Sequence, residues 1–124
     1  MGILFLPFLG CSNDPAAAKV TGTVTLDGNP VPSAEITFVP EDGSRISQAM
    51  TNSEGKYELR FSASKTGAMI GTHKVTIRTG PSEKSDDPNA AKEIIPKKYH
   101  SESQLKETLK AGKNTVDFNL TTQP

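Results

Sequence analysis

The side chains best suited to chemistry are few and far apart: one cysteine, Cys11, and two histidines, His73 and His100. A zinc site needs several nitrogen, sulfur or oxygen ligands that converge on one point. Neither histidine has a second ligand at the spacing of a helix turn or a hairpin, and no histidine or acidic partner surrounds Cys11 to activate it as a nucleophile. No serine lies in a G-x-S-x-G turn. We therefore predict no catalytic residue, no cofactor site and no metal site, and a protein that is not an enzyme.

Acidic side chains occur mainly where turns are expected. Asp27, Asp42 and Glu54 each precede a glycine, and Asp86 and Asp87 lie in a long segment without periodicity. Calcium requires six to eight oxygen ligands brought together, as in the D-x-[DN]-x-[DN]-G loop, and no such pattern is present. Turn formation is the simpler explanation for these residues.

The residues before Cys11 suggest why the chain keeps a single cysteine. The apolar run at residues 3–9 is far shorter than the roughly 20 residues that span a bilayer as a helix. It is typical of the end of a secretory signal, which stops at a small residue. The residues Phe8-Leu9-Gly10-Cys11 resemble the lipobox of bacterial lipoproteins, whose cysteine is acylated after the signal is removed. A free cysteine at a chain end is the alternative.

This resemblance implies an organisation for the N-terminal part. Residues 1–10 would be a signal peptide remnant, and residues 11–18 a lipidated tether whose acyl chains on Cys11 bind the membrane. Each buried methylene contributes about 0.8 kcal/mol, so several chains suffice for stable anchoring. We expect the folded domain to lie outside the cytoplasm, at the bacterial cell envelope.

Composition limits the remaining function classes. The 124 residues suit one domain, and 14 basic and 14 acidic residues give a net charge of zero. A balanced chain offers no electrostatic argument for binding nucleic acid. The hydrophobic content of 34% and the absence of tryptophan predict a thin core, which suits a small β-sandwich.

Apolar and polar residues alternate along most of the chain, which predicts half-buried β-strands. About seven short strands, separated by glycine and proline turns, indicate an all-β fold, a single antiparallel β-sandwich with one long loop. The side chains expected to face inward on the clearest strands are Val20, Gly22, Val24, Leu26, Ile36, Phe38, Tyr57, Leu59, Phe61, His73, Val75, Ile77, Val116, Phe118 and Leu120.

Two segments are harder to assign. Residues 80–100 contain three prolines and a charged run, and we expect a long loop whose distal part packs across the sandwich, with His100 solvated. Residues 101–112 fit either a helix or a strand. We favour a strand, with Glu107 pointing inward and residues 111–114 forming a hairpin into the last strand.

Three stretches carry a family resemblance: VTGTVTLDGNPVPSAEITFVP, TNSEGKYEL and GTHKVTI. They resemble a carboxypeptidase regulatory-like domain of the transthyretin-like superfamily, in the short lipoprotein form that ends in a pattern like IPKKYHSESQLKETLKAGKNTVDFNL. The resemblance covers residues 19–121, with residues 122–124 as a tail. It implies a transthyretin-like, immunoglobulin-like sandwich and a non-catalytic accessory role, and it supplies no ligand residues.

We therefore expect a membrane-anchored lipoprotein that presents its sandwich as a binding or structural module, with a protein or glycan partner. One alternative is a structural envelope component that assembles with other copies through a sheet edge. Another is an accessory module for a carbohydrate or small ligand. Glycan binding would favour exposed aromatic residues, and the chain has only two tyrosines and no tryptophan.

Overall fold

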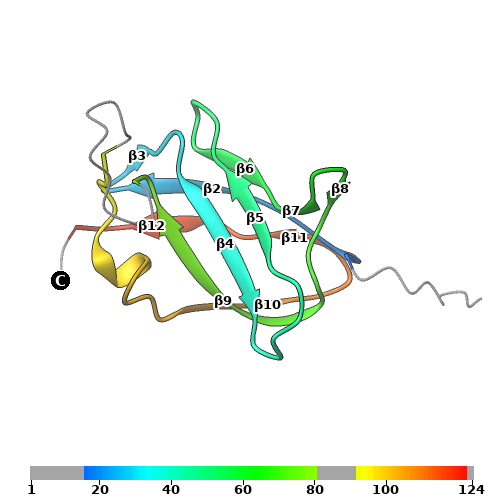
Figure 1. Ribbon diagram of the computed structural model, residues 1–124. Coiled ribbons are helices and arrows are strands. Elements are labelled where there is room, and N and C mark those ends of the chain that lie inside the picture. The colour runs from blue at the N-terminus through cyan, green and yellow to red at the C-terminus, as the bar shows by residue number, and fades with distance from the viewer. Residues whose placement is uncertain (1–15, 81–91, 123–124) are drawn as a thin grey trace, which may run out of the picture.

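The computed structural model describes residues 16–80 and 92–122, and there the chain forms two packed β-sheets (Figure 1). The predicted all-β sandwich is confirmed, with one short 3-10 helix, η1 (Lys97–Tyr99), in the described part. These residues hold eleven strands rather than about seven, because two of the predicted strands are each broken in two and short pairings are added at turns. Cys11 lies outside the described residues.

The larger sheet has six antiparallel strands in the order β10-β9-β4-β5-β7-β8. Its strands are β10 (Leu105–Leu109), β9 (Gly71–Arg78), β4 (Glu35–Pro40), β5 (Ser47–Met50), β7 (Arg60–Ser62) and β8 (Lys65–Thr66). The longest pairing joins β4 to β9, whereas β5 and β7 share a single residue pair, Gln48 with Arg60. The sheet is therefore weakly joined between β5 and β7.

The smaller sheet is built around β2 (Ala18–Leu26). Its other strands are β3 (Asn29–Pro30), β6 (Lys56–Glu58), β11 (Gly112–Thr115) and β12 (Phe118–Leu120). β3 and β6 pair with β2 in the antiparallel sense, but β11 and β12 run parallel to it. The larger sheet and the pairings of β3 and β6 are antiparallel as predicted, and β11 and β12 add two parallel pairings. In Figure 1 β2 runs obliquely to β4 of the facing sheet.

The core lies between the two sheets, and it follows the predicted alternation. Burying apolar surface is the main force that holds such a sandwich together. The predicted inward side chains at the centre are buried, and half-buried side chains such as Leu26 and Val116 pack at the margin. The largest fully buried side chains are Phe38, Ile36, Leu59, Ile77, Leu109, His73, Val20, Val24, Val31 and Val75.

The predicted strand that carries Tyr57, Leu59 and Phe61 changes sheets at Leu59. The backbone N–H of Leu59 donates to the carbonyl of Val20 in β2 at 2.9 Å, while its carbonyl accepts from Gly67 at 2.8 Å. One residue therefore serves both sheets, so β6 pairs with β2 and β7 pairs with β5. This crossing also explains why β7 has so short a pairing with β5.

The ambiguous segment at residues 101–112 does contain a strand, β10, which pairs with β9 and places Glu107 beside His73. The predicted hairpin after it is wrong, because β10 belongs to the six-stranded sheet and β11 to the five-stranded sheet. The side chain of Asn114 stabilises this crossing by bonding both the N–H and the carbonyl of Lys110, at 3.1 and 2.8 Å. The end of the predicted long loop packs as expected, with Ile95 buried in the core.

Candidate functional site

The two histidines are held apart in separate structural roles. His73 is fully buried on β9, its ring packs 5.6 Å from that of Phe38, and its Nε2 donates to the carbonyl of Met69 at 2.8 Å. Its Nδ1 has no hydrogen-bond partner in the part of the chain that the structure describes. This is a core histidine that faces inward, as the strand pattern predicts.

His100 is not solvated, and that prediction is wrong. Its Nε2 bonds the carbonyl oxygen of Ile95 at 2.9 Å, and its side chain retains only 12% exposure. The ring packs into the base of the long loop because η1 turns the chain back toward β9. His100 also lies 3.9 Å from a carboxylate oxygen of Glu93.

Glu93 organises that base, and no sequence pattern indicated it. Its carboxylate accepts hydrogen bonds from the backbone N–H groups of Thr79, Gly80 and Ile95, at 2.9, 3.2 and 3.0 Å, and from the Thr79 hydroxyl at 3.0 Å. Burial alone would raise the pKa of Glu93, but these hydrogen bonds outweigh it and lower the pKa below its ordinary value of 4.5. Three of these bonds end on Oε2 and one on Oε1, so the carboxylate is held mainly by the backbone of the two segments that it joins.

The acidic and histidine residues do not converge on a metal site. Within residues 16–80 and 92–122, no group of three or more histidine, cysteine or acidic side chains could hold an ion. The same residues contain no helix long and apolar enough to cross a membrane.

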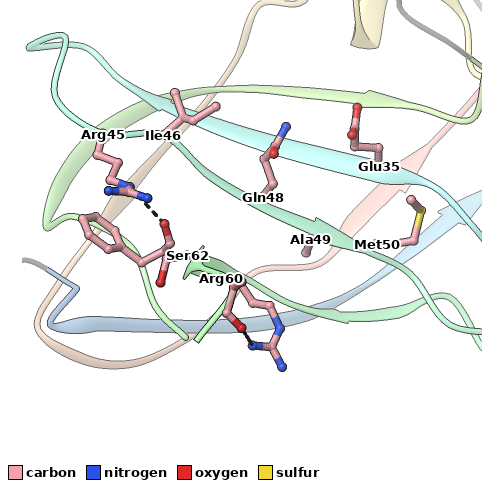
Figure 2. Close-up of a pocket in the computed structure, with 10 residues that line it drawn as sticks. Glu35, Arg45, Ile46, Gln48, Ala49, Met50, Arg60 and Ser62 are labelled. Carbon is pink, nitrogen blue, oxygen red and sulfur yellow. Dashed lines mark hydrogen bonds between the residues drawn. The ribbon is translucent and has the colours of Figure 1, made fainter. Parts of the chain in front are cut away.

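A pocket of about 440 Å³ lies along the weak junction between β5 and β7 (Figure 2). Its lining comes from β4, β5, β7 and the segments beside them, with Arg45 at one end and Glu35 and Met50 at the other. The ring of Phe61 lies next to Arg45. Ligand pockets commonly have volumes of about 300–1,000 Å³. The size of this pocket therefore suits a small molecule or part of a larger one.

Apolar side chains are unusually exposed around this pocket. Ile46 and Met50 are 41% and 60% exposed, and both line it together with Ala49, Phe61 and Ala63. Phe61, predicted to point into the core, is only half-buried because its strand has left β2 and reached the margin of the larger sheet. The exposed apolar side chains of the pocket walls are therefore available to contact a ligand.

Two arginines border these apolar walls, and the backbone holds both in place. Arg45 donates through Nε to the carbonyl of Phe61 at 3.2 Å, and its guanidinium lies 4.9 Å from the centre of the Phe61 ring. Arg60 donates through a terminal nitrogen to the carbonyl of Ala63 at 3.2 Å. Neither guanidinium forms an ion pair within the described residues. Their remaining N–H groups are free to bind an anion.

The pocket lining carries a net positive charge, since it holds two arginines and one carboxylate, Glu35. Arg78 of β9 is the cross-strand neighbour of Glu35, so the charge of Glu35 is partly balanced from outside the pocket. The sequence analysis missed this site because alternation placed Arg60 on an ordinary solvated face. Arg45 and Phe61 meet only through the fold.

The reactive side chains of the lining lie apart from one another. The lining contains no histidine or cysteine, and its hydroxyl, Ser62, lies toward the Arg45 end while its carboxylate, Glu35, lies at the other (Figure 2). A nucleophile and its base must instead be within hydrogen-bond reach of each other.

In comparisons with known proteins, no family model, no curated protein and no solved structure matches this chain. The resemblance to a carboxypeptidase regulatory-like domain therefore stays a prediction.

Proposed function

We propose that this protein is a non-catalytic binding module, held at the membrane of the bacterial cell envelope by acyl chains on Cys11. The observation that carries the proposal is the pocket between β5 and β7, where fixed arginines border exposed apolar side chains. Such a site has the composition of a binding surface: apolar walls with a few polar groups that set orientation.

The start of the folded domain supports an anchor close to this pocket. Ala18 begins β2 and bonds Ala68, while Lys19 donates to the carbonyl of Thr66 in β8 at 3.1 Å. β8 pairs with β7, and Ala63 of the pocket lies in the turn between them. Residues 12–17 could reach about 20 Å at 3.3–3.6 Å per residue. A membrane that holds Cys11 would then lie near the pocket end of the sandwich.

Other roles for the domain receive less support from the geometry. Assembly through a sheet edge would use β10, the longer edge strand of the larger sheet, and this strand carries Lys106 and Glu107. Charged residues on an edge oppose pairing with another strand. A glycan platform would need a fully exposed aromatic ring. Tyr57 is buried, while Phe61 and Tyr99 are half-buried and each has a basic side chain over its ring.

The anchor is tested on protein extracted from the membranes of the cell that makes it. Intact mass should show a chain that begins at Cys11 and carries a lipid-sized increment. Cys11→Ser should abolish the increment and move the protein out of the membrane fraction, whereas the neighbouring Ser12→Ala should change neither. An unmodified chain that retains Met1 would refute the anchor.

A further inference from the structure

We propose that the pocket between β5 and β7 binds a single-chain amphiphilic anion, an alkyl chain that ends in a carboxylate or phosphate. This inference rests on the proposed binding function and names the class of ligand. Its charged head and apolar tail correspond to the two features of the pocket, the two arginines in the lining and the exposed apolar walls.

The arginines define the head group. A guanidinium matches the geometry of a carboxylate or phosphate through two parallel hydrogen bonds. Arg45 uses only Nε within the protein and leaves both terminal nitrogens available, while its guanidinium lies 4.9 Å from the centre of the Phe61 ring, which restrains the group. A side chain held in place before binding loses less entropy when the ligand arrives. The anionic head therefore belongs at the Arg45 end.

The apolar walls define the tail. Ile46, just before β5, and Met50 at its end lie on one face with Gln48 between them, so an alkyl chain lying along this face would cover both (Figure 2). Ala49 points to the opposite face and packs against the core. Each buried methylene adds to the binding free energy, so a chain of several carbons would add affinity that the head alone lacks. Glu35 at the far end disfavours a second negative charge there. A ligand with one charged head and one apolar tail fits this arrangement better than a polyanion.

The position of the pocket agrees with this ligand. The turn between β7 and β8 lies beside the start of β2, at the end of the domain from which the proposed tether leads to the membrane. Free fatty carboxylates and single-chain lipid phosphates are released from membranes, so they would be present near this end. The two sources share the same chemistry and differ in the head group.

The test is a titration of the full, unmodified chain in solution with octanoate and, separately, octyl phosphate, both below their micelle concentrations. Backbone amide NMR signals should shift for residues 45–50 and 60–63, and the tighter of the two probes identifies the head group. Acetate lacks the tail and octanol lacks the charge, so each should bind at least about tenfold more weakly than octanoate. If acetate or octanol bound as tightly as octanoate, the proposal that the pocket recognises both a charged head and an apolar tail would be overturned.

A second experiment compares substitutions inside and outside the pocket, to distinguish binding by the pocket arginines from nonspecific attraction to positive charge. Arg45→Gln with Arg60→Gln should weaken octanoate binding about tenfold or more. Lys74→Gln removes an exposed charge from β9, outside the pocket, and should leave binding within about twofold. NMR spectra of both variants confirm that the fold is retained. An equal loss in the two variants, or binding of anionic vesicles without binding of either free probe, would refute the proposal. These measurements use protein without a lipid anchor. Ligand binding can therefore be refuted while lipidation of Cys11 is confirmed, and lipidation can be refuted while ligand binding is confirmed.

Discussion

The hydroxyl of Tyr57 donates a hydrogen bond to the backbone carbonyl oxygen of Val116, 2.5 Å away, where the chain passes between β11 and β12. Beside it, the carboxylate of Asp117 accepts the N–H of Thr23 at 2.9 Å. Side chains thus replace the backbone pairing that the break in the strand removes. The interruption between β11 and β12 is therefore a specified feature of the fold.

Gly22 makes the approach of this carbonyl possible, and its substitution tests the arrangement. A Cβ atom added at Gly22 would lie 1.7 Å from the carbonyl oxygen of Val116 and 2.9 Å from the Tyr57 ring. Because the first obstacle is backbone, it cannot move aside cheaply. We expect Gly22→Ala to lower the free energy of unfolding by about 3 kcal/mol, measured by urea denaturation.

Gly43→Ala is the matched control for that measurement. Gly43 lies in an exposed turn with φ of 80° and has open space around its Cβ position, so only backbone strain opposes the substitution. This strain costs roughly 1–2 kcal/mol. If Gly22→Ala were as mild as Gly43→Ala, the close approach of Val116 to Gly22 would be wrong.

Tyr57→Phe removes the hydroxyl and leaves the ring in place. The carbonyl of Val116 then loses its partner at a half-buried position, which costs about 1–2 kcal/mol of unfolding free energy. The ring contact with Phe118, at 6.3 Å between centroids, should persist. Thermal unfolding followed by circular dichroism measures the loss. A variant as stable as the parent would show that this hydrogen bond contributes nothing.

The two tyrosines should ionise at well separated pH values. Burial, with the negative charges of Asp117 and Glu107, raises the pKa of Tyr57 above its ordinary value of 10.0. Burial opposes ionisation of Tyr99 too, but hydrogen bonds from Thr121 and the charge of Lys98 outweigh it and lower its pKa. Tyrosinate absorbance should therefore rise for one residue below pH 10 and for the second only at higher pH.

This separation has a consequence for stability in alkali. A folded-state pKa raised above the unfolded value means that Tyr57 contributes stability that is fully present below pH 10 and lost as the pH rises through its folded pKa. Tyr57→Phe should remove this component of alkaline unfolding and abolish the late absorbance step, while Tyr99→Phe should abolish the early one. Coincident titration of both residues in the folded protein would contradict the burial of Tyr57.

Local alternation predicted most of the core because side chains on a strand point to opposite faces with a period of two. The same rule could not locate the points where the chain changes partners. Leu59 and Val116 fit their patterns, yet the hydrogen bonds to Val20 and Tyr57 that divide the strands there join residues far apart in sequence. The hairpin expected at residues 111–114 failed for the same reason, since turn residues do not specify which sheet the next strand joins.

The candidate site was harder to predict from the sequence than the fold was. Arg45 and Phe61 are 16 residues apart and meet only because β7 crosses to the larger sheet at Leu59. The alternation of the strand alone assigns Arg60 to the solvent-exposed face, together with other polar residues. The signal that could have indicated the pocket is the pair of exposed apolar residues, Ile46 and Met50, at positions of β5 and its approach where the alternation expects polar side chains.

Glu93→Gln tests whether one carboxylate holds the base of the long loop. The substitution removes the charge that accepts three backbone N–H groups and the Thr79 hydroxyl, and should lower the unfolding free energy by about 2 kcal/mol at neutral pH. Glu102→Gln, nearby and exposed, changes the same charge without these bonds and should have little effect. Equal effects of the two substitutions would refute the role of Glu93.

The pH dependence of the same pair gives the sharper result. The pKa of Glu93 is lowered in the folded state, so its contribution is fully present above the ordinary value of 4.5 and is lost as the pH falls through the folded pKa. Urea denaturation of the parent and of Glu102→Gln should therefore show stability declining below pH 4.5 more steeply than in Glu93→Gln. Parallel decline in all three proteins would show that the hydrogen bonds from Thr79, Gly80 and Ile95 do not hold this carboxylate ionised.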